Sequence, residues 1–345
     1  MPLAINNSRI LKLLCLVLLM TLAVVSHGTQ AINNSDLKNQ LKIRIADDKR
    51  DIQAYIALAT IELEQGDLIS TEATVKSALR YARKPQSKLE LYTLGIILED
   101  RSQDFKAALR YYKRGKRIKG SDHAAALHLA MAKVYLRARN FGDARLLLQQ
   151  SLAAESMNNE EAETVLASLQ RIERALALTN SDFAYEKSIS RGEIARLLNR
   201  DLGVTRLLGV SAVKSVGETS DQGLTDYTGS VFAEDIIASH RLNLRSFRIR
   251  NGAFNPDRQL TRSELALLVE DLLHFKFNIS RTSFIGTESP FSDLSSSATG
   301  FNAVMSAVTR GLMKGREDGT IGPTDLVSGA EAVLVLHNLN QMLQK

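Results

Sequence analysis

The chain is poor in the residues that build covalent cross-links, metal clusters and extended stalks. Its 345 residues include one cysteine, Cys15, which excludes an intramolecular disulfide and a multi-cysteine metal site. Five prolines are too few for a collagen-like or proline-rich stalk. Hydrophobic residues make up 44% and charged residues 24%, as in ordinary globular proteins, so disorder along the whole chain is excluded. The length suffices for two or three domains.

No apolar run reaches the ~20 residues that a membrane-spanning helix needs. Two basic residues precede an apolar run at 13–25, and a polar stretch with small residues follows it up to Ala31. This layout predicts a signal peptide at 1–31, cleaved after Ala31 or after Gly28, with an uncleaved membrane anchor as the alternative. We expect a mature chain without a transmembrane segment, secreted across the inner membrane into the periplasm or cell envelope.

Motifs of the common enzyme classes are also missing. The sequence holds no His-Glu-x-x-His metal motif, no Gly-x-Ser-x-Gly nucleophile elbow and no phosphate-binding Gly-x-x-x-x-Gly-Lys loop. His128 falls on a helix-packing position, which favours a core residue over a metal ligand. We therefore expect no enzyme, no cofactor and no metal site, with an envelope enzyme of unrecognised type as the alternative.

Residues 36–178 contain a repeat. The repeated turns are Gly66-Asp67-Leu68, Gln103-Asp104-Phe105 and Arg139-Asn140-Phe141, at spacings of 37 and 36 residues. Apolar residues at helical spacing precede each turn, and a second helical pattern with small residues follows it. This order predicts three antiparallel helix pairs stacked as a solenoid, with flanking helices at 36–50 and 161–178.

The solenoid pattern resembles the tetratricopeptide repeat (TPR), whose unit is ~34 residues. The match is best in the third repeat, whereas the first has Glu62 at the family's tyrosine position and Thr71 at its alanine position. The resemblance implies a concave groove that binds a peptide or a helix of an unidentified envelope protein. The alternative is a helical spacer without a partner.

The second repeat carries a run of positive charge. Residues 101–119 hold eight basic side chains against one acid, Asp104. Such a run is commonly a solvated helix face, but the excess of one sign also makes a patch that attracts an anionic partner or surface. No nucleic-acid recognition motif accompanies it, so we expect no nucleic-acid partner.

A different repeat occupies residues 181–345. Its tetrapeptides are Ser190-Arg191-Gly192-Glu193, Thr261-Arg262-Ser263-Glu264 and Ser328-Gly329-Ala330-Glu331, at spacings of 71 and 67 residues, and an apolar helical run follows each. A Ser or Thr followed three positions later by Glu is a capping box, in which the hydroxyl and the carboxylate each bond a backbone amide of the helix start. We therefore expect three capped helices.

The flanking residues extend this second pattern. Phe232-Ala233-Glu234-Asp235 and Phe291-Ser292-Asp293 are expected to open the second and third units, and glycine-rich loops with a proline, at 251–256 and 315–323, precede two of the boxes. Together these features resemble the S-layer homology (SLH) module. The resemblance implies three mostly helical modules, near 181–205, 231–275 and 290–345, whose grooves bind an anionic cell-wall glycan.

The resemblance implies that the arginine of each box contacts the glycan. The expected glycan-binding residues are Arg191 and Arg262, with the box residues Ser190, Thr261, Glu193 and Glu264 around them. An arginine at a helix start lies near free amides that favour anions, and we expect both guanidinium groups to face solvent. The alternative is that they pair with nearby acids such as Glu193 and Glu264.

Two departures from the family pattern are visible. Gly329 replaces the box arginine in the third module, and the chain has no tryptophan. Additional positive charge beside the second module comes from Arg241, Arg245, Arg248 and Arg250.

The sequence therefore predicts an all-α protein with a TPR-like solenoid at 36–178 and an SLH-like domain at 181–345. The expected function is that of a non-enzymatic cell-envelope adaptor that binds a cell-wall polymer, an anionic glycan or peptidoglycan, and a partner protein. The alternative is a periplasmic assembly scaffold or chaperone-like factor without glycan binding.

Overall fold

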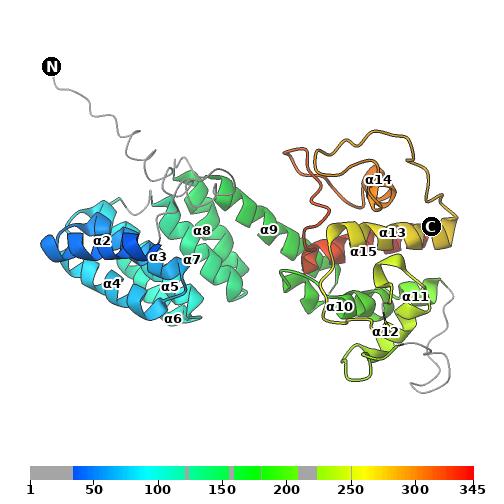
Figure 1. Cartoon of the computed structure of the whole chain (residues 1–345), viewed down its shortest axis with the longest axis horizontal. Coiled ribbons are helices and arrows are strands. Elements are labelled where there is room, and N and C mark those ends of the chain that lie inside the picture. The colour runs from blue at the N-terminus through cyan, green and yellow to red at the C-terminus, as the bar shows by residue number, and fades with distance from the viewer. Residues whose placement is uncertain (1–33, 121–123, 155–158, 180, 209–223, 250) are drawn as a thin grey trace. The chain divides into compact units, whose positions relative to one another are not determined.

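The computed structural model describes residues 34–120, 124–154, 159–179, 181–208, 224–249 and 251–345. Within these ranges the regular elements are helices, joined by loops with two isolated β-bridges, which confirms the predicted all-α class (Figure 1). The predicted signal peptide at 1–31 and Arg250 lie outside the described residues. None of the helices in the described part of the chain has the length and apolar character needed to cross a bilayer.

The chain divides into two compact units, Met1–Ala162 and Glu163–Lys345. The helices up to this division and across it are α2 (Asn34–Asp47), α3 (Ile52–Glu64), α4 (Leu68–Tyr81), α5 (Pro85–Arg101), α6 (Phe105–Gly115), α7 (Ala125–Arg137), α8 (Phe141–Ala153) and α9 (Asn159–Leu178). The first unit contains the three predicted antiparallel pairs, α3 with α4, α5 with α6 and α7 with α8. The TPR resemblance itself remains a prediction.

The turn inside each helix pair repeats one local structure. A residue with positive φ follows the C-cap of the first helix. The next residue caps the second helix by accepting a hydrogen bond from the amide three positions on. The residues with positive φ are Gly66 (76°), Gln103 (59°) and Arg139 (58°). The capping residues are Asp67, Asp104 and Asn140. This shared turn explains why the sequence spacing located the helix pairs.

Small residues let the paired helices approach closely. A Cβ atom at Gly95 would lie 2.6 Å from the ring of Tyr111, so only glycine fits beneath this aromatic side chain.

Glu62, which stands at the family's tyrosine position, is buried and accepts a hydrogen bond from the hydroxyl of Thr74 at 2.8 Å. His128 is buried and hydrogen bonds to Tyr112 at 3.0 Å, which confirms that it belongs to the core.

The basic run is concentrated on the exposed face of α6. The opposite face of α6 is buried and consists of alanine, tyrosine and glycine residues. Helix geometry puts Lys106, Arg110 and Lys113 within a narrow arc on the exposed face of α6, and all three side chains are exposed. Arg101 is different, because it donates to the backbone carbonyl of Leu63 in the preceding repeat. The positive face is therefore smaller than the sequence run from which it was predicted.

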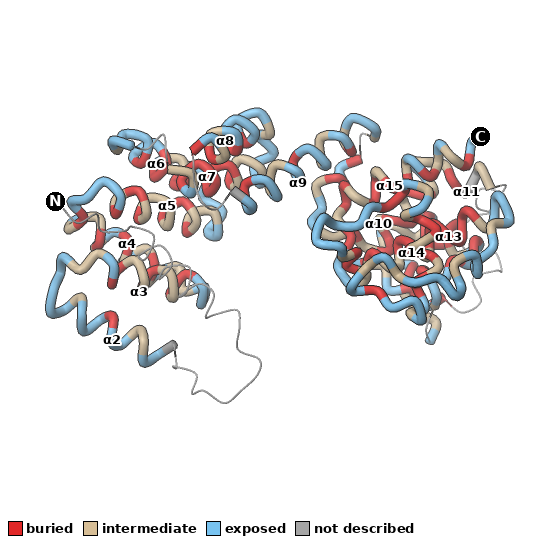
Figure 2. Tube along the Cα trace, turned by 90° about the horizontal axis from the view of Figure 1, so that it is seen from above, coloured by how far each residue is buried: buried red, intermediate tan, exposed pale blue. Residues whose placement is uncertain are grey.

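The second unit is built around the three helices that follow the predicted boxes. Its elements after α9 are η2 (Asp182–Tyr185), α10 (Arg191–Arg196), η3 (Leu197–Asp201), α11 (Val204–Leu207), α12 (Ala233–His240), η4 (Arg245–Phe247), α13 (Arg262–Phe277), α14 (Phe301–Thr309) and α15 (Gly329–Leu343). Figure 2 shows buried residues along α10, α13, α14 and α15, which surround one core.

A closed ring of backbone hydrogen bonds holds the three box segments together. The amide of Ile189 donates to the carbonyl of Val327 (2.8 Å), Val327 donates to Leu260 (2.9 Å), and Leu260 donates back to Ile189 (3.0 Å). Each of these residues lies immediately before the N-cap of its box helix, and each side chain is fully buried. The three box segments therefore meet around an approximate threefold axis.

The second module begins earlier than its expected opening at Phe232. In the third module, Asp293 accepts hydrogen bonds from two amides of the loop before its box, at 2.8 and 2.7 Å. The corresponding side chain in the second module is Asp226, which makes the same pair of bonds at 2.7 Å each. Asp235 is instead fully buried in an ion pair with Arg200. The expected start near residue 231 is therefore too late.

Gly329 replaces arginine because the segment before the first box covers this position. The amide of Gly329 donates to the carbonyl of Glu186 at 2.8 Å, and a Cβ atom at Gly329 would overlap the carbonyl oxygen of Phe183. Backbone atoms of this segment thus occupy the space that a box arginine would need. The glycine is a packing requirement of the third module.

We predict that Gly329→Ala lowers the free energy of unfolding of the second unit by about 2 kcal/mol, because the added methyl group meets backbone. Urea denaturation followed by circular dichroism measures this loss. The matched control is Gly229→Ala in the same unit, where a Cβ atom would meet nothing within 4 Å. Equal stability of the Gly329 variant and the control would contradict the packing explanation.

Candidate functional site

The first two capping boxes form as predicted. The hydroxyl of Ser190 accepts from the amide of Glu193 (3.3 Å), whose carboxylate accepts from the amide of Ser190 (2.7 Å). Thr261 and Glu264 make the equivalent bonds at 3.3 and 3.0 Å. These four side chains are therefore used to cap the first two box helices.

The helix starts do not offer free amides to an anion. The amide of Arg191 donates to the carbonyl of Arg258, and that of Arg262 donates to the carbonyl of Asp325, both at 2.9 Å. The next amide in each helix donates to the carbonyl of Pro256 or Pro323. The expectation of anion binding by unpaired amides is therefore wrong, because the loop of the following module already satisfies them.

Arg262 is a structural side chain. It is 7% exposed, and its Nε donates to the carboxylate of Glu331 at 2.9 Å. Its two terminal nitrogens donate to the backbone carbonyls of Ile321 and Lys314. The expectation that this guanidinium faces solvent is wrong, because it joins the second module to the third.

Pairing with Arg262 also changes the third box. Ser328 caps α15 by accepting from the amide of Glu331 at 3.2 Å, but the Glu331 carboxylate forms an ion pair with Arg262 instead of the second capping bond. The third capping box is therefore only half formed.

Arg191 is buried but has no carboxylate partner among the described residues. It is 3% exposed, and its guanidinium lies over the ring of Phe254, 4.6 Å from the centroid. Its Nε has no hydrogen-bond partner, and one terminal nitrogen makes a long bond of 3.4 Å to the carbonyl of Arg248. Burial, followed by repulsion from Arg258, lowers the pKa of Arg191 to about 10, so it stays cationic at neutral pH. The expectation that it faces solvent is also wrong.

Arg258 explains why the two box arginines differ. It lies three residues before Thr261 and holds the Glu264 carboxylate at 2.6 Å. At the same place before the third box the chain has Asp325, which pairs with Arg316 and leaves the third-module glutamate free to bind Arg262. Because Arg258 holds Glu264, Arg191 keeps a buried charge without an ion pair among the described residues.

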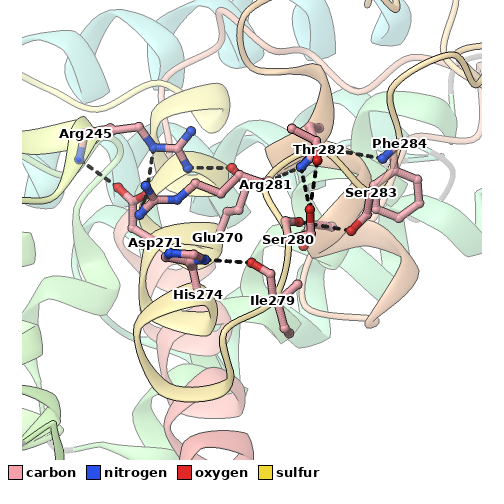
Figure 3. Close-up of polar contacts among 12 residues, drawn as sticks. Arg245, Glu270, Asp271, His274, Ile279, Ser280, Arg281, Thr282, Ser283 and Phe284 are labelled. Atoms are coloured by element: carbon pink, nitrogen blue, oxygen red, sulfur yellow. Dashed lines mark hydrogen bonds and ion pairs between the residues drawn. The ribbon is translucent and has the colours of Figure 1, made fainter.

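Arg191 lines a cavity that we call the first groove. This groove has a volume of 1350 Å³ and is bordered by Phe247, Arg248, Arg258 and Glu264 among others. Two other arginines of the groove are paired: Arg245 and Arg281 both bind the buried carboxylate of Asp271, at 2.7 and 3.0 Å (Figure 3).

Three cations of the first groove lack an ion pair within the described part of the chain. Arg241 and Arg248 are exposed at the groove, and neither makes a salt bridge there. With Arg191 they give the groove an excess of positive charge, opposed by Glu264 alone among its lining acids. A cavity with this charge attracts anions. Within the described ranges no group of three His, Cys, Asp or Glu side chains is arranged to hold a metal ion.

Box arginines were visible in the sequence, but their different surroundings were not. Arg258 was not identified from the sequence. It could have been found by comparing the modules, because Arg258 lies three residues before the capping threonine and the next module has Asp325 at the matching position. The aromatic ring of Phe254 beneath Arg191 was also missed.

Two comparisons with known proteins gave matches. Residues 290–333 match the family model described as the S-layer homology domain, which confirms the predicted resemblance over the third module. A protein named Cell surface glycoprotein 1, from Acetivibrio thermocellus, is 34% identical over 119 residues, which is 34% of this chain and 5% of that protein. The chain thus spans only a small part of this relative's length.

We predict stability effects of different size for the two box arginines when each is replaced by methionine. Arg262→Met leaves the Glu331 carboxylate and two backbone carbonyls without their donor, and should lower the free energy of unfolding by about 3 kcal/mol. Arg191→Met removes an unpaired buried charge and should change it by less than about 1 kcal/mol. Urea denaturation measures both, and similar losses in the two variants would contradict the assignment of different roles.

Proposed function

We propose that the second unit anchors the protein to the cell surface by binding an acidic cell-wall polymer in the first groove. The observation that carries the proposal is the buried guanidinium of Arg191, which lines a large groove without a carboxylate partner. A planar guanidinium suits a carboxylate or phosphate group, and a buried cation gains most from an anionic ligand. Arg241 and Arg248 supply further charge along the same groove.

The comparisons support a location of the protein at the cell surface. The matched family is named for S-layer proteins, and the relative from Acetivibrio thermocellus is named as a cell surface glycoprotein. Both findings agree with the signal peptide expected at 1–31 and with a position in the cell envelope. Glycan binding by Arg191 rests on the geometry of the first groove.

The first unit completes the proposed adaptor as the part that binds a protein partner. Its helix pairs stack in sequence, and α6 presents Lys106, Arg110 and Lys113 on one exposed face. Because none of these side chains forms a salt bridge within the described residues, an acidic segment of an envelope protein would complement them. A scaffold without glycan binding is the second candidate, and the α6 surface by itself fits both.

We predict that Arg191→Met weakens binding of the mature chain to isolated cell-wall sacculi by at least about tenfold, because the ligand loses its buried cation. Sedimentation with sacculi at low salt measures the dissociation constant. Lys187→Met is the matched control, since Lys187 is exposed and lines none of the described grooves. Unchanged binding by a folded Arg191 variant would leave the scaffold as the better candidate.

For the first unit we predict that charge reversal of Lys106, Arg110 and Lys113 to glutamate abolishes co-purification of the partner from envelope extracts. The control reverses Lys49, Arg50 and Arg83, which are exposed in the same unit and give the same change in net charge. Quantitative mass spectrometry of the captured proteins compares the two. Equal loss in both variants would assign capture to net charge and not to the α6 face.

A further inference from the structure

The second half of α9 belongs to the core of the second unit, although it precedes the three modules in the sequence. Ala175 is fully buried in the core of this unit, and Ile172 and Leu176 pack against the same core. Because this apolar face packs on the core, it decides which side chains of α9 are exposed. The polar side chains at Arg171 and Arg174 are consequently exposed on another side of the helix.

Both of these arginines line a second groove, next to the buried Arg262. This groove has a volume of 570 Å³ and is also bordered by Lys314 and Glu331. Arg171 and Arg174 are three residues apart, so their Cβ atoms lie about 5–6 Å from each other along one face of the helix. The second groove is therefore built partly by a helix outside the three modules.

Most of the modules' own charges in the second groove are already paired. Arg262 binds Glu331, and Arg316 binds Asp325, which raises the pKa of Arg316 through its hydrogen bond to this carboxylate.

The cations that remain in the second groove are mainly those of α9. Arg171 makes no ion pair within the described ranges, and Arg174 donates only to the carbonyl of Gln170 in its own helix, at 3.3 Å. Lys314 is exposed and also lacks an ion pair there, whereas Glu317 is the one lining carboxylate without a partner. The excess charge of this groove is positive.

We propose that Arg171 and Arg174, with Lys314, form a second anion-binding site that takes another acidic group of the same wall polymer. This inference rests on the proposed function of the first groove and extends it, because the box arginine of the second groove is occupied by Glu331. The cations come from α9, so this site depends on the helix before the modules. Two sites on one chain of polymer raise the overall affinity without a new contact at either site.

The test uses the full mature chain and polymer released from isolated sacculi, cut into single repeating units. Isothermal titration should give two bound units per wild-type chain, one per chain for Arg171→Ala with Arg174→Ala, and one for Arg191→Met. With uncut polymer, the double variant should bind about tenfold more weakly than wild type because it loses the second attachment. The matched control is Lys187→Ala with Lys276→Ala, which removes two exposed charges that line neither groove.

The possible outcomes separate the two proposals. One bound unit in the wild type that persists in the double variant, with uncut polymer bound equally well, would overturn the α9 site and leave the first groove intact. Loss of only the first-groove site in Arg191→Met supports both proposals, whereas no effect of that variant contradicts the proposed function itself. Circular dichroism confirms the fold of each variant, and an equal effect of the control pair would overturn the specific role of α9.

Discussion

The ring of three backbone hydrogen bonds among Ile189, Leu260 and Val327 is the constraint on which the second unit depends. Each residue donates to one neighbour and accepts from the other, so the box segment of every module is held by both of the others. Because the ring residues are fully buried, an unmade bond would leave a buried polar group without a partner. The ring therefore links three sequence-distant segments into one core, which no single module could form.

This closed arrangement also determines what the start of each box helix can do. The loop before the box of the next module supplies carbonyls to the first amides of the helix, so these carbonyls compensate the positive end of the helix dipole. The first amides of the box helices are therefore not available to an anion. The grooves consequently differ by the charges that the loops and flanking helices bring to them.

The approximate symmetry of the three modules allows matching positions of the grooves to be compared. Arg258 and Asp325 occupy matching places before their boxes, and this exchange of sign redirects the glutamate of each box. Glu264 stays with its own cap and with Arg258, whereas Glu331 crosses to Arg262. One groove thus has a buried arginine without an ion pair among the described residues, and the other uses its arginine to join two modules.

Much of the architecture was predictable from local sequence signals. The turns around Gly66, Gln103 and Arg139, and the boxes at Ser190 and Thr261, involve residues within a few positions of each other, and local hydrogen bonding decides their structure. Regular spacing of these signals then indicated helix pairs in the first unit and three modules in the second.

The sequence by itself determined the helical class, the repeats and the box arginines as candidate ligand residues. Only the tertiary structure decided which box arginine is paired and that Asp226 opens the second module. It also decided that Gly329 lies against backbone and that Arg171 and Arg174 of α9 line a groove. The physical reason is that the charge state and burial of a side chain depend on neighbours brought together by packing. Arg262 and Glu331 are far apart in sequence, and no local pattern records that they meet.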